Sequence, residues 1–126
     1  MRTSWPGQMY IGGKWVDSET GRTLPVINPA NGKELGSVAL AGVEDVDGAV
    51  QAARKAFDEG PWPRLDPLAR GRYLFRLAEL VRKHGEDLAM TDTLNVGKPI
   101  RDSRGFDVPA AIELFESYAG LSDKIA

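Results

Sequence analysis

The chain has 126 residues, of which 42% are hydrophobic and 27% are charged, and its 16 Lys plus Arg nearly balance 18 Asp plus Glu. This composition is typical of a folded soluble domain and unlike that of a disordered segment, while the net charge of −2 gives no general attraction to nucleic acid or to anionic lipid. Cys is absent, which excludes disulfides, thiolate metal sites and a cysteine nucleophile among these residues.

The first forty residues predict short strands separated by turns. Gly12 and Gly13 stand between two β-forming segments and tolerate the positive φ of a tight turn, so we expect a β-hairpin over residues 9–17. Further strands are expected at Thr23–Ile27 and Leu35–Ala39, because the Asn and Gly residues between them favour a turn.

The hydrophobic spacing becomes helical from Val43 onward. Apolar side chains recur every three or four residues on one face of a first helix, which we expect to end at Gly60-Pro61. That face consists of Val46, Val50, Ala53 and Phe57.

A second helix is predicted over residues 67–83. Asp66 is a good N-cap, and Pro67 suits the first helical position because the N–H that it lacks would have no partner there. Gly85 should interrupt or end this helix, and a helical period then continues to Asn95.

The stretch from Arg64 to Lys83 is basic, with six positive residues against two acidic ones. We interpret it as a solvated helix face, because a nucleic-acid site would need several aromatic rings on the charged face and only Phe75 lies on that face. Phe75 is either a contact with another chain or with parts of this one outside these residues, or an isolated exposed aromatic side chain.

A last helix is expected within Ile100–Ala119. Pro109 leaves two alternatives: the helix begins near Val108 with Asp107 as its cap, or a longer helix is kinked at the proline. The apolar coverage of this segment is nearly complete, which indicates a helix buried on more than one side.

Motifs of self-contained catalysis are missing from the sequence. Gly97-Lys98 is followed by Pro99 rather than by Ser or Thr, so it is not a P-loop, and no glycine-rich dinucleotide fingerprint occurs. His84 is the only His, which excludes a His-based metal cluster, and there is no serine-nucleophile motif. We therefore predict no catalytic and no cofactor-binding residue here.

Six segments together carry a resemblance to a known family. They are YIGGKWVDS (10–18), VINPANGKELGSV (26–38), EDVDGAVQAARKAFDEGPW (44–62), RGRYLFRLAELV (70–81), LNVGKPI (94–100) and FDVPAAIELFESYAGLSDKI (106–125). In this order and spacing they resemble the N-terminal segment of the NAD(P)-dependent aldehyde dehydrogenase superfamily. The resemblance implies an α+β arrangement, with a β-hairpin and short strands followed by three or four α-helices. Residues 1–126 would be the leading, incomplete part of an α/β Rossmann-like cofactor-binding domain, without the catalytic and oligomerisation parts.

The resemblance also implies a reaction for the full enzyme. Members of the family oxidise an aldehyde to a carboxylic acid with NAD or NADP, through a cysteine thiohemiacetal and a thioester that a glutamate general base helps to hydrolyse. The nucleophile, the base and the asparagine of the oxyanion hole lie outside the segment that this chain matches. We therefore expect this chain alone to bind no cofactor and to be inactive.

A few positions inherit candidate roles from the resemblance. Phe106 and Ala110 match residues that line the substrate tunnel in relatives, with core packing as the alternative. Ile27 matches a backbone carbonyl, and Asn95 matches an Asp side chain, that bind a monovalent cation in some relatives. An amide at position 95 keeps a carbonyl oxygen but lacks the negative charge.

Expected partners are the remainder of an aldehyde dehydrogenase chain or a full-length paralogue, and the full enzyme should be a homodimer or homotetramer. Neither nucleic acid nor membrane is expected as a partner, and the lack of a signal peptide favours a cytoplasmic protein. One alternative is a stand-alone helical module that binds a full-length aldehyde dehydrogenase through the apolar last helix and Phe75. Another is a degenerate remnant that hardly folds.

Overall fold

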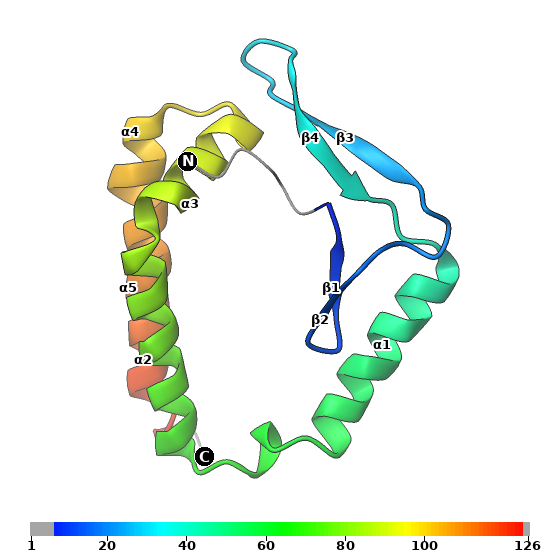
Figure 1. Cartoon of the computed structure of the whole chain (residues 1–126). Coiled ribbons are helices and arrows are strands. Elements are labelled where there is room, and N and C mark those ends of the chain that lie inside the picture. Colours follow the sequence, from blue (N-terminus) through cyan, green and yellow to red (C-terminus); the bar gives the residue numbers. More distant parts are fainter. Residues whose placement is uncertain (1–6, 125–126) are drawn as a thin grey trace. The chain divides into compact units, whose positions relative to one another are not determined.

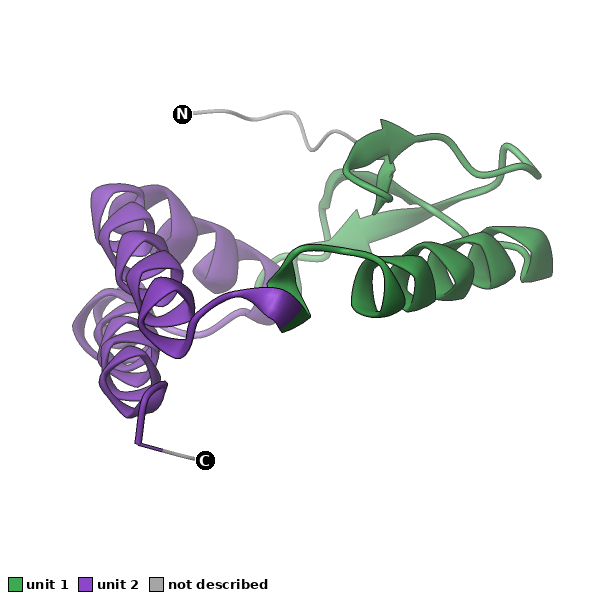
Figure 2. Cartoon of the chain, turned by 90° about the horizontal axis from the view of Figure 1, so that it is seen from below, with its two compact units in different colours: residues 1–63 green, residues 64–126 purple. Residues whose placement is uncertain are grey.

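The computed structural model describes residues 7–124. The chain divides into two compact units, residues 1–63 and residues 64–126 (Figure 2). The first unit contains all four strands and one long helix, and the second is helical (Figure 1). This arrangement confirms the α+β prediction of short antiparallel strands followed by helices.

The first two strands form the expected hairpin. β1 (Met9–Ile11) pairs antiparallel with β2 (Lys14–Val16), and Gly12 and Gly13 adopt positive φ in the turn. Tyr10 lies opposite Trp15, with their ring centroids 5.0 Å apart, so an aromatic cross-strand pair supports the hairpin.

The next two strands form a second antiparallel ribbon. β3 (Thr23–Ile27) pairs with β4 (Glu34–Ala39), which begins one residue before the predicted start. An irregularity in the register falls between Val26 and Ile27, where the chain turns. The buried Asn28 organises this turn, because its Oδ1 atom accepts a hydrogen bond of 2.9 Å from the N–H of Ala30.

α1 (Val43–Asp58) follows the ribbon and ends before Gly60, as predicted. Its apolar face is exposed: Val46, Val50 and Phe57 all lie open, and the guanidinium of Arg54 covers only one side of the Phe57 ring, 4.6 Å from its centroid. Periodicity correctly indicated which side of the helix is apolar, but periodicity cannot say what packs against that side.

One carboxylate fastens α1 to the strand region. Asp45, at the third position of the helix, is only 7% exposed. Its Oδ2 atom accepts hydrogen bonds from the N–H of Gly42 at 2.8 Å and from Ser18 Oγ at 2.9 Å, and Oδ1 accepts one from the N–H of Glu19 at 3.1 Å. The carboxylate thereby joins the start of α1 to Ser18 and Glu19, which lie more than twenty residues earlier in the sequence.

The second unit is built around two long helices. α2 (Pro67–Lys83) begins as predicted, with the Asp66 Oδ1 atom accepting a 2.7 Å hydrogen bond from the N–H of Leu68. It packs along α5 (Val108–Leu121), and the shared core consists of small or branched residues: Gly71 and Ala78 on α2, Ile112 and Ala119 on α5. α3 (Gly85–Val96) follows α2 directly and ends at Gly97, whose φ is 81°.

The last helix corresponds to the longer of the two predicted alternatives. α4 (Ile100–Asp102), a π-helical turn η2 (Ser103–Asp107) and α5 follow one another without a break, and the N–H of Val108 donates to the carbonyl of Ser103. The π-turn widens the helix just before Pro109. The other alternative is right that the regular α-helix begins at Val108, but wrong that Asp107 caps it, because Asp107 has helical φ and ψ and its side chain makes no cap hydrogen bond.

The expectation that the last helix is buried on more than one side is not met among the described residues, where only Ile112 and Ala119 of α5 are buried. Leu114 is 57% and Tyr118 is 56% exposed, although both belong to the apolar arc. Among residues 7–124, no helix is both long and apolar enough to span a membrane.

Candidate functional site

The two residues matched to a substrate tunnel lie at the start of the last helix. Phe106 belongs to the π-turn η2 and is 71% exposed, whereas Ala110 lies one turn further along in α5 and is half-buried. The Phe106 ring therefore projects into solvent rather than into the core of this unit. Tunnel lining and core packing in a full-length enzyme both stay predictions for Phe106 and Ala110.

A buried serine connects the π-turn to α3. Ser103 is fully buried, and its hydroxyl donates a hydrogen bond of 2.6 Å to Asp92 Oδ2 and lies 3.2 Å from the hydroxyl of Thr93. No buried side-chain polar atom among the described residues is left without a partner. The polar cluster is thus fully satisfied, which favours one fixed arrangement of these segments.

Two ion pairs hold the same turn from outside. Lys98, in the loop before α4, pairs with Asp107 at the end of η2. Arg104 pairs with Glu86 on α3 through its Nε and Nη2 atoms, and the Nε atom lies 2.8 Å from Oε2. The hydrogen bond to Asp107 raises the pKa of Lys98, and the hydrogen bond from Arg104 lowers the pKa of Glu86. The pairing also raises the pKa of Arg104, so the charged forms of Lys98, Arg104 and Glu86 are all favoured.

The two residues matched to a cation site belong to different units. Ile27 is the last residue of β3 in the first unit, and Asn95 is exposed near the end of α3 in the second. Each is therefore placed within its own unit only, and a joint site stays a prediction. Within the described part of the chain, no three His, Asp or Glu side chains are grouped so that they could hold a metal ion.

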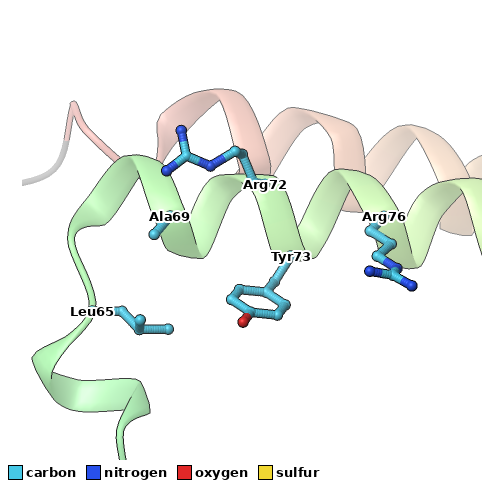
Figure 3. Close-up of a pocket in the computed structure, with 5 residues that line it drawn as sticks. All are labelled: Leu65, Ala69, Arg72, Tyr73 and Arg76. Carbon is cyan, nitrogen blue, oxygen red and sulfur yellow. The ribbon is translucent and has the colours of Figure 1, made fainter.

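An open hollow of about 350 Å³ lies beside the first half of α2. Its lining residues are Leu65, Ala69, Arg72, Tyr73 and Arg76. Figure 3 shows Leu65, Tyr73 and Arg76 on one side of the helix, whereas the guanidinium of Arg72 extends to the other side. The lining offers two guanidinium groups, the phenol of Tyr73 and apolar side chains, but no carboxylate, His or Ser.

The sequence analysis missed most of the polar contacts at this site. Ser103 gives no signal, because a serine in the middle of a helical run is read as neutral. Lys98 and Asp107 are nine residues apart, which is outside the spacing rules of a single helix. The capping role of Asp45 could have been predicted from the sequence, because an acidic residue at the third position of a helix often accepts a hydrogen bond from the N–H of the N-cap residue.

Together, the fold and the site define an α+β segment of short antiparallel strands followed by helices. A family model for the aldehyde dehydrogenase family matches residues 15–126. The chain belongs to the aldehyde dehydrogenase family.

Individual relatives agree with this assignment. The chain is 46% identical over 118 residues to aldehyde dehydrogenase family 2 member B4, mitochondrial, of Arabidopsis thaliana, and 40% identical over 118 residues to benzaldehyde dehydrogenase, mitochondrial, of Antirrhinum majus. In both cases the match covers 94% of this chain and 22% of the relative.

A solved structure of aldehyde dehydrogenase from Bacillus cereus in complex with NAD⁺ superposes with a TM-score of 0.91 at 38% identity. That match covers 94% of this chain and 24% of the Bacillus chain. The chain therefore spans less than a quarter of the length of these relatives.

Proposed function

We propose that these residues serve as the N-terminal part of the cofactor-binding domain in an enzyme that oxidises aldehydes to carboxylic acids with NAD or NADP. The observation that carries the proposal is the family match over residues 15–126, together with the superposition on the Bacillus cereus enzyme over 94% of the chain. The bound NAD(P) would accept a hydride from the substrate. No residue among 7–124 forms a phosphate-binding loop, so we assign no cofactor contact to this chain.

The chemistry of the family requires groups that these residues do not supply. A thiol has to attack the aldehyde carbon, and a base has to activate water for hydrolysis of the thioester. The sequence contains no Cys, so the chain alone cannot form the thiohemiacetal. We therefore propose that it is inactive by itself and acts as a scaffold and as one wall of the substrate passage.

Two features support this role. Phe106 projects from a turn that three polar contacts hold, and Ala110 follows one helical turn later, so the pair could line a passage for an apolar aldehyde. The exposed Leu114 and Tyr118 of α5 give an apolar face that the remaining three quarters of a full-length chain would cover.

Finer points stay predictions. A monovalent cation held by the carbonyl of Ile27 and the amide of Asn95, a homodimeric or homotetrameric full enzyme, and a cytoplasmic location all derive from the resemblance or from composition. Both plant relatives are named as mitochondrial proteins, so the cytoplasmic location stays a prediction. The stand-alone interaction module has no observation that favours it over the enzyme segment.

A domain-exchange experiment tests the proposal. Residues 1–126 would replace the matching segment of the Bacillus cereus aldehyde dehydrogenase, and NADH formation would be followed with short-chain and aromatic aldehydes. We expect turnover from the chimera and none from the 126-residue chain alone, because only the chimera contains the nucleophile and the base. A chimera in which the nucleophilic Cys is replaced by Ala is the matched control.

Two results would contradict the proposal. Turnover by the chain alone would show that it carries its own catalytic groups. A chimera that is folded, soluble and able to bind NAD⁺ but does not oxidise any aldehyde would show that these residues cannot fill the role of the N-terminal segment.

A further inference from the structure

The π-turn η2 is an interruption in an otherwise regular helical run from Ile100 to Leu121. The hydrogen bond from the N–H of Val108 to the carbonyl of Ser103 spans five residues instead of four, which widens the helix at this point. A widened turn has poorer packing and hydrogen-bond geometry than an α-helix. Its presence here therefore needs contacts that stabilise it.

Three of the five residues in the turn are held by side-chain contacts to other segments. The hydroxyl of Ser103 donates to Asp92 on α3 at 2.6 Å, Arg104 pairs with Glu86 on α3, and Asp107 pairs with Lys98 in the preceding loop. We call these three contacts the turn contacts.

The start of α5 also lies tightly against α3. A Cβ atom on Gly85 would lie only 3.3 Å from Val108 Cγ1. A residue with a side chain would therefore fit at position 85 only if Val108 moved. The turn contacts and this close approach thus act on both ends of η2.

The other two residues of the turn face open space. A Cβ atom on Gly105 would meet nothing within 4 Å, and Phe106 is 71% exposed. The turn is therefore held on the side of α3 and free on the side of Phe106. A turn held in this way fixes the backbone of Phe106, and with it the direction in which the Cα–Cβ bond of Phe106 points.

We propose that the contacts of Ser103 and Asp107 position the Phe106 ring and thereby determine which aldehydes the enzyme accepts. Ser103, Asp92, Asp107 and Lys98 are positioning residues in this proposal, because they act through the turn that carries Phe106. The proposal rests on the function proposed above, in which Phe106 lines the passage for the aldehyde. It goes further by assigning selectivity to polar side chains behind that ring.

A first experiment reads the Phe106 ring directly in the 126-residue chain. The sequence contains four Phe, so labelling with fluorophenylalanine gives a small set of ¹⁹F NMR lines, and Phe106→Leu identifies the line of interest. We expect Lys98→Met and Ser103→Ala to shift or broaden the Phe106 line and to leave the lines of Phe57 and Phe75 unchanged. Amide hydrogen exchange in residues 104–108 should become faster by roughly tenfold.

Arg101→Met is the matched control. Arg101 lies in α4 close to the turn, and its 3.1 Å ion pair joins it only to the neighbouring Asp102. The substitution removes the same charge as Lys98→Met without breaking a turn contact, so the Phe106 line should not move. Lys98→Arg retains the cation and should restore the wild-type line. If Lys98→Met prevents folding, Asp107→Asn tests the same pair with a smaller change.

A second experiment measures selectivity in the chimera. Lys98→Met should lower kcat/KM for a bulky aromatic aldehyde by about tenfold, mainly through KM, and change kcat for acetaldehyde by no more than about twofold. An unchanged ¹⁹F line, or a line that moves equally in Arg101→Met, overturns the positioning role. An active chimera with an unchanged ratio of kcat/KM values overturns the selectivity role. An inactive chimera counts against the proposed function instead, while the NMR result still decides whether the turn contacts fix the ring.

Discussion

Replacing Gly71 by Ala is expected to destabilise the helical unit by about 1–3 kcal/mol, although alanine is the better helix former. Gly71 lies in the second turn of α2, where it faces the end of α5. A Cβ atom at this position would lie 2.8 Å from the carbonyl oxygen of Ala119 and even closer to the hydroxyl of Ser122. The serine could rotate away, but the backbone carbonyl of Ala119 could move only if the two helices separated.

Gly120→Ala is the matched control for this substitution. Gly120 lies in α5, is exposed, and would place its new Cβ atom in open space. The same chemical change should therefore stabilise the unit by about 1 kcal/mol through helix propensity alone. The two substitutions should have opposite signs.

The measurement is the free energy of unfolding from the helical circular dichroism signal in denaturant, with hydrogen exchange of α2 and α5 amides as a second readout. Equal stabilisation by both substitutions would contradict the close packing of α2 on α5. Intrinsic fluorescence is unsuitable here, because all three Trp precede residue 64.

Asp45→Asn should lower the thermal midpoint of the first unit by about 5 °C or more. The amide has nearly the shape of the carboxylate but only one acceptor oxygen. Whichever way it is oriented, its NH₂ group would face either the N–H of Glu19 or the donors at Gly42 and Ser18. A buried donor would thus be left opposite another donor. Since the tryptophans lie in residues 1–63, fluorescence follows this unit selectively.

The effect of Asp45 should depend on pH with a definite sign. Hydrogen bonds from the N–H groups of Gly42 and Glu19 hold the pKa of Asp45 below its ordinary value, against the opposing effect of burial. A carboxyl group with a lowered pKa in the folded state contributes stability above its unfolded pKa, near about 3.9, and this contribution disappears as the pH falls through the folded pKa. The difference in midpoint between the wild type and Asp45→Asn should therefore be largest at neutral pH and shrink below about pH 4.

Asp47→Asn provides the control for charge alone. Asp47 is exposed on the same helix two residues later, so its substitution should change the fluorescence midpoint little. Glu86 and Asp123 also have lowered pKa values, but both lie in the second unit, which fluorescence does not follow. A constant midpoint difference across this pH range would rule out the proposed role of the Asp45 carboxylate.

Local rules predicted most of the element boundaries. The hairpin at Gly12-Gly13 and the start of α2 at Asp66 depend on φ preferences and caps that act within a few residues of the chain. The start of the last helix was left open, because Pro109 is compatible both with an early position in a new helix and with a distortion of a longer one. The structure has the distorted longer helix. Ser103 and Asp107 contact other segments there, and local rules do not predict such contacts.

The candidate site shows the same division. The apolar character of Phe106 and the lack of a thiol were visible in the sequence, as was the resemblance to aldehyde dehydrogenases. The sequence did not reveal that Phe106 lies in a π-turn or which polar groups hold that turn. The path of the chain in space decides which of these groups meet. From the sequence alone, any charged or hydroxylic residue on α3 would have been an equally good candidate for a contact with the turn.

The sequence by itself therefore determined the order of the strands and helices, the apolar side of each helix and the family to which the chain belongs. These follow from periodicity, capping and residue identity, which are properties of neighbouring positions. Only the tertiary structure decided that Asp45 is buried, that Gly71 must lack a side chain and that η2 is held from α3. Each of these depends on close approach between segments distant in the sequence. There, a change of a few tenths of an ångström in a contact distance, or one missing hydrogen-bond partner, changes the free energy of unfolding.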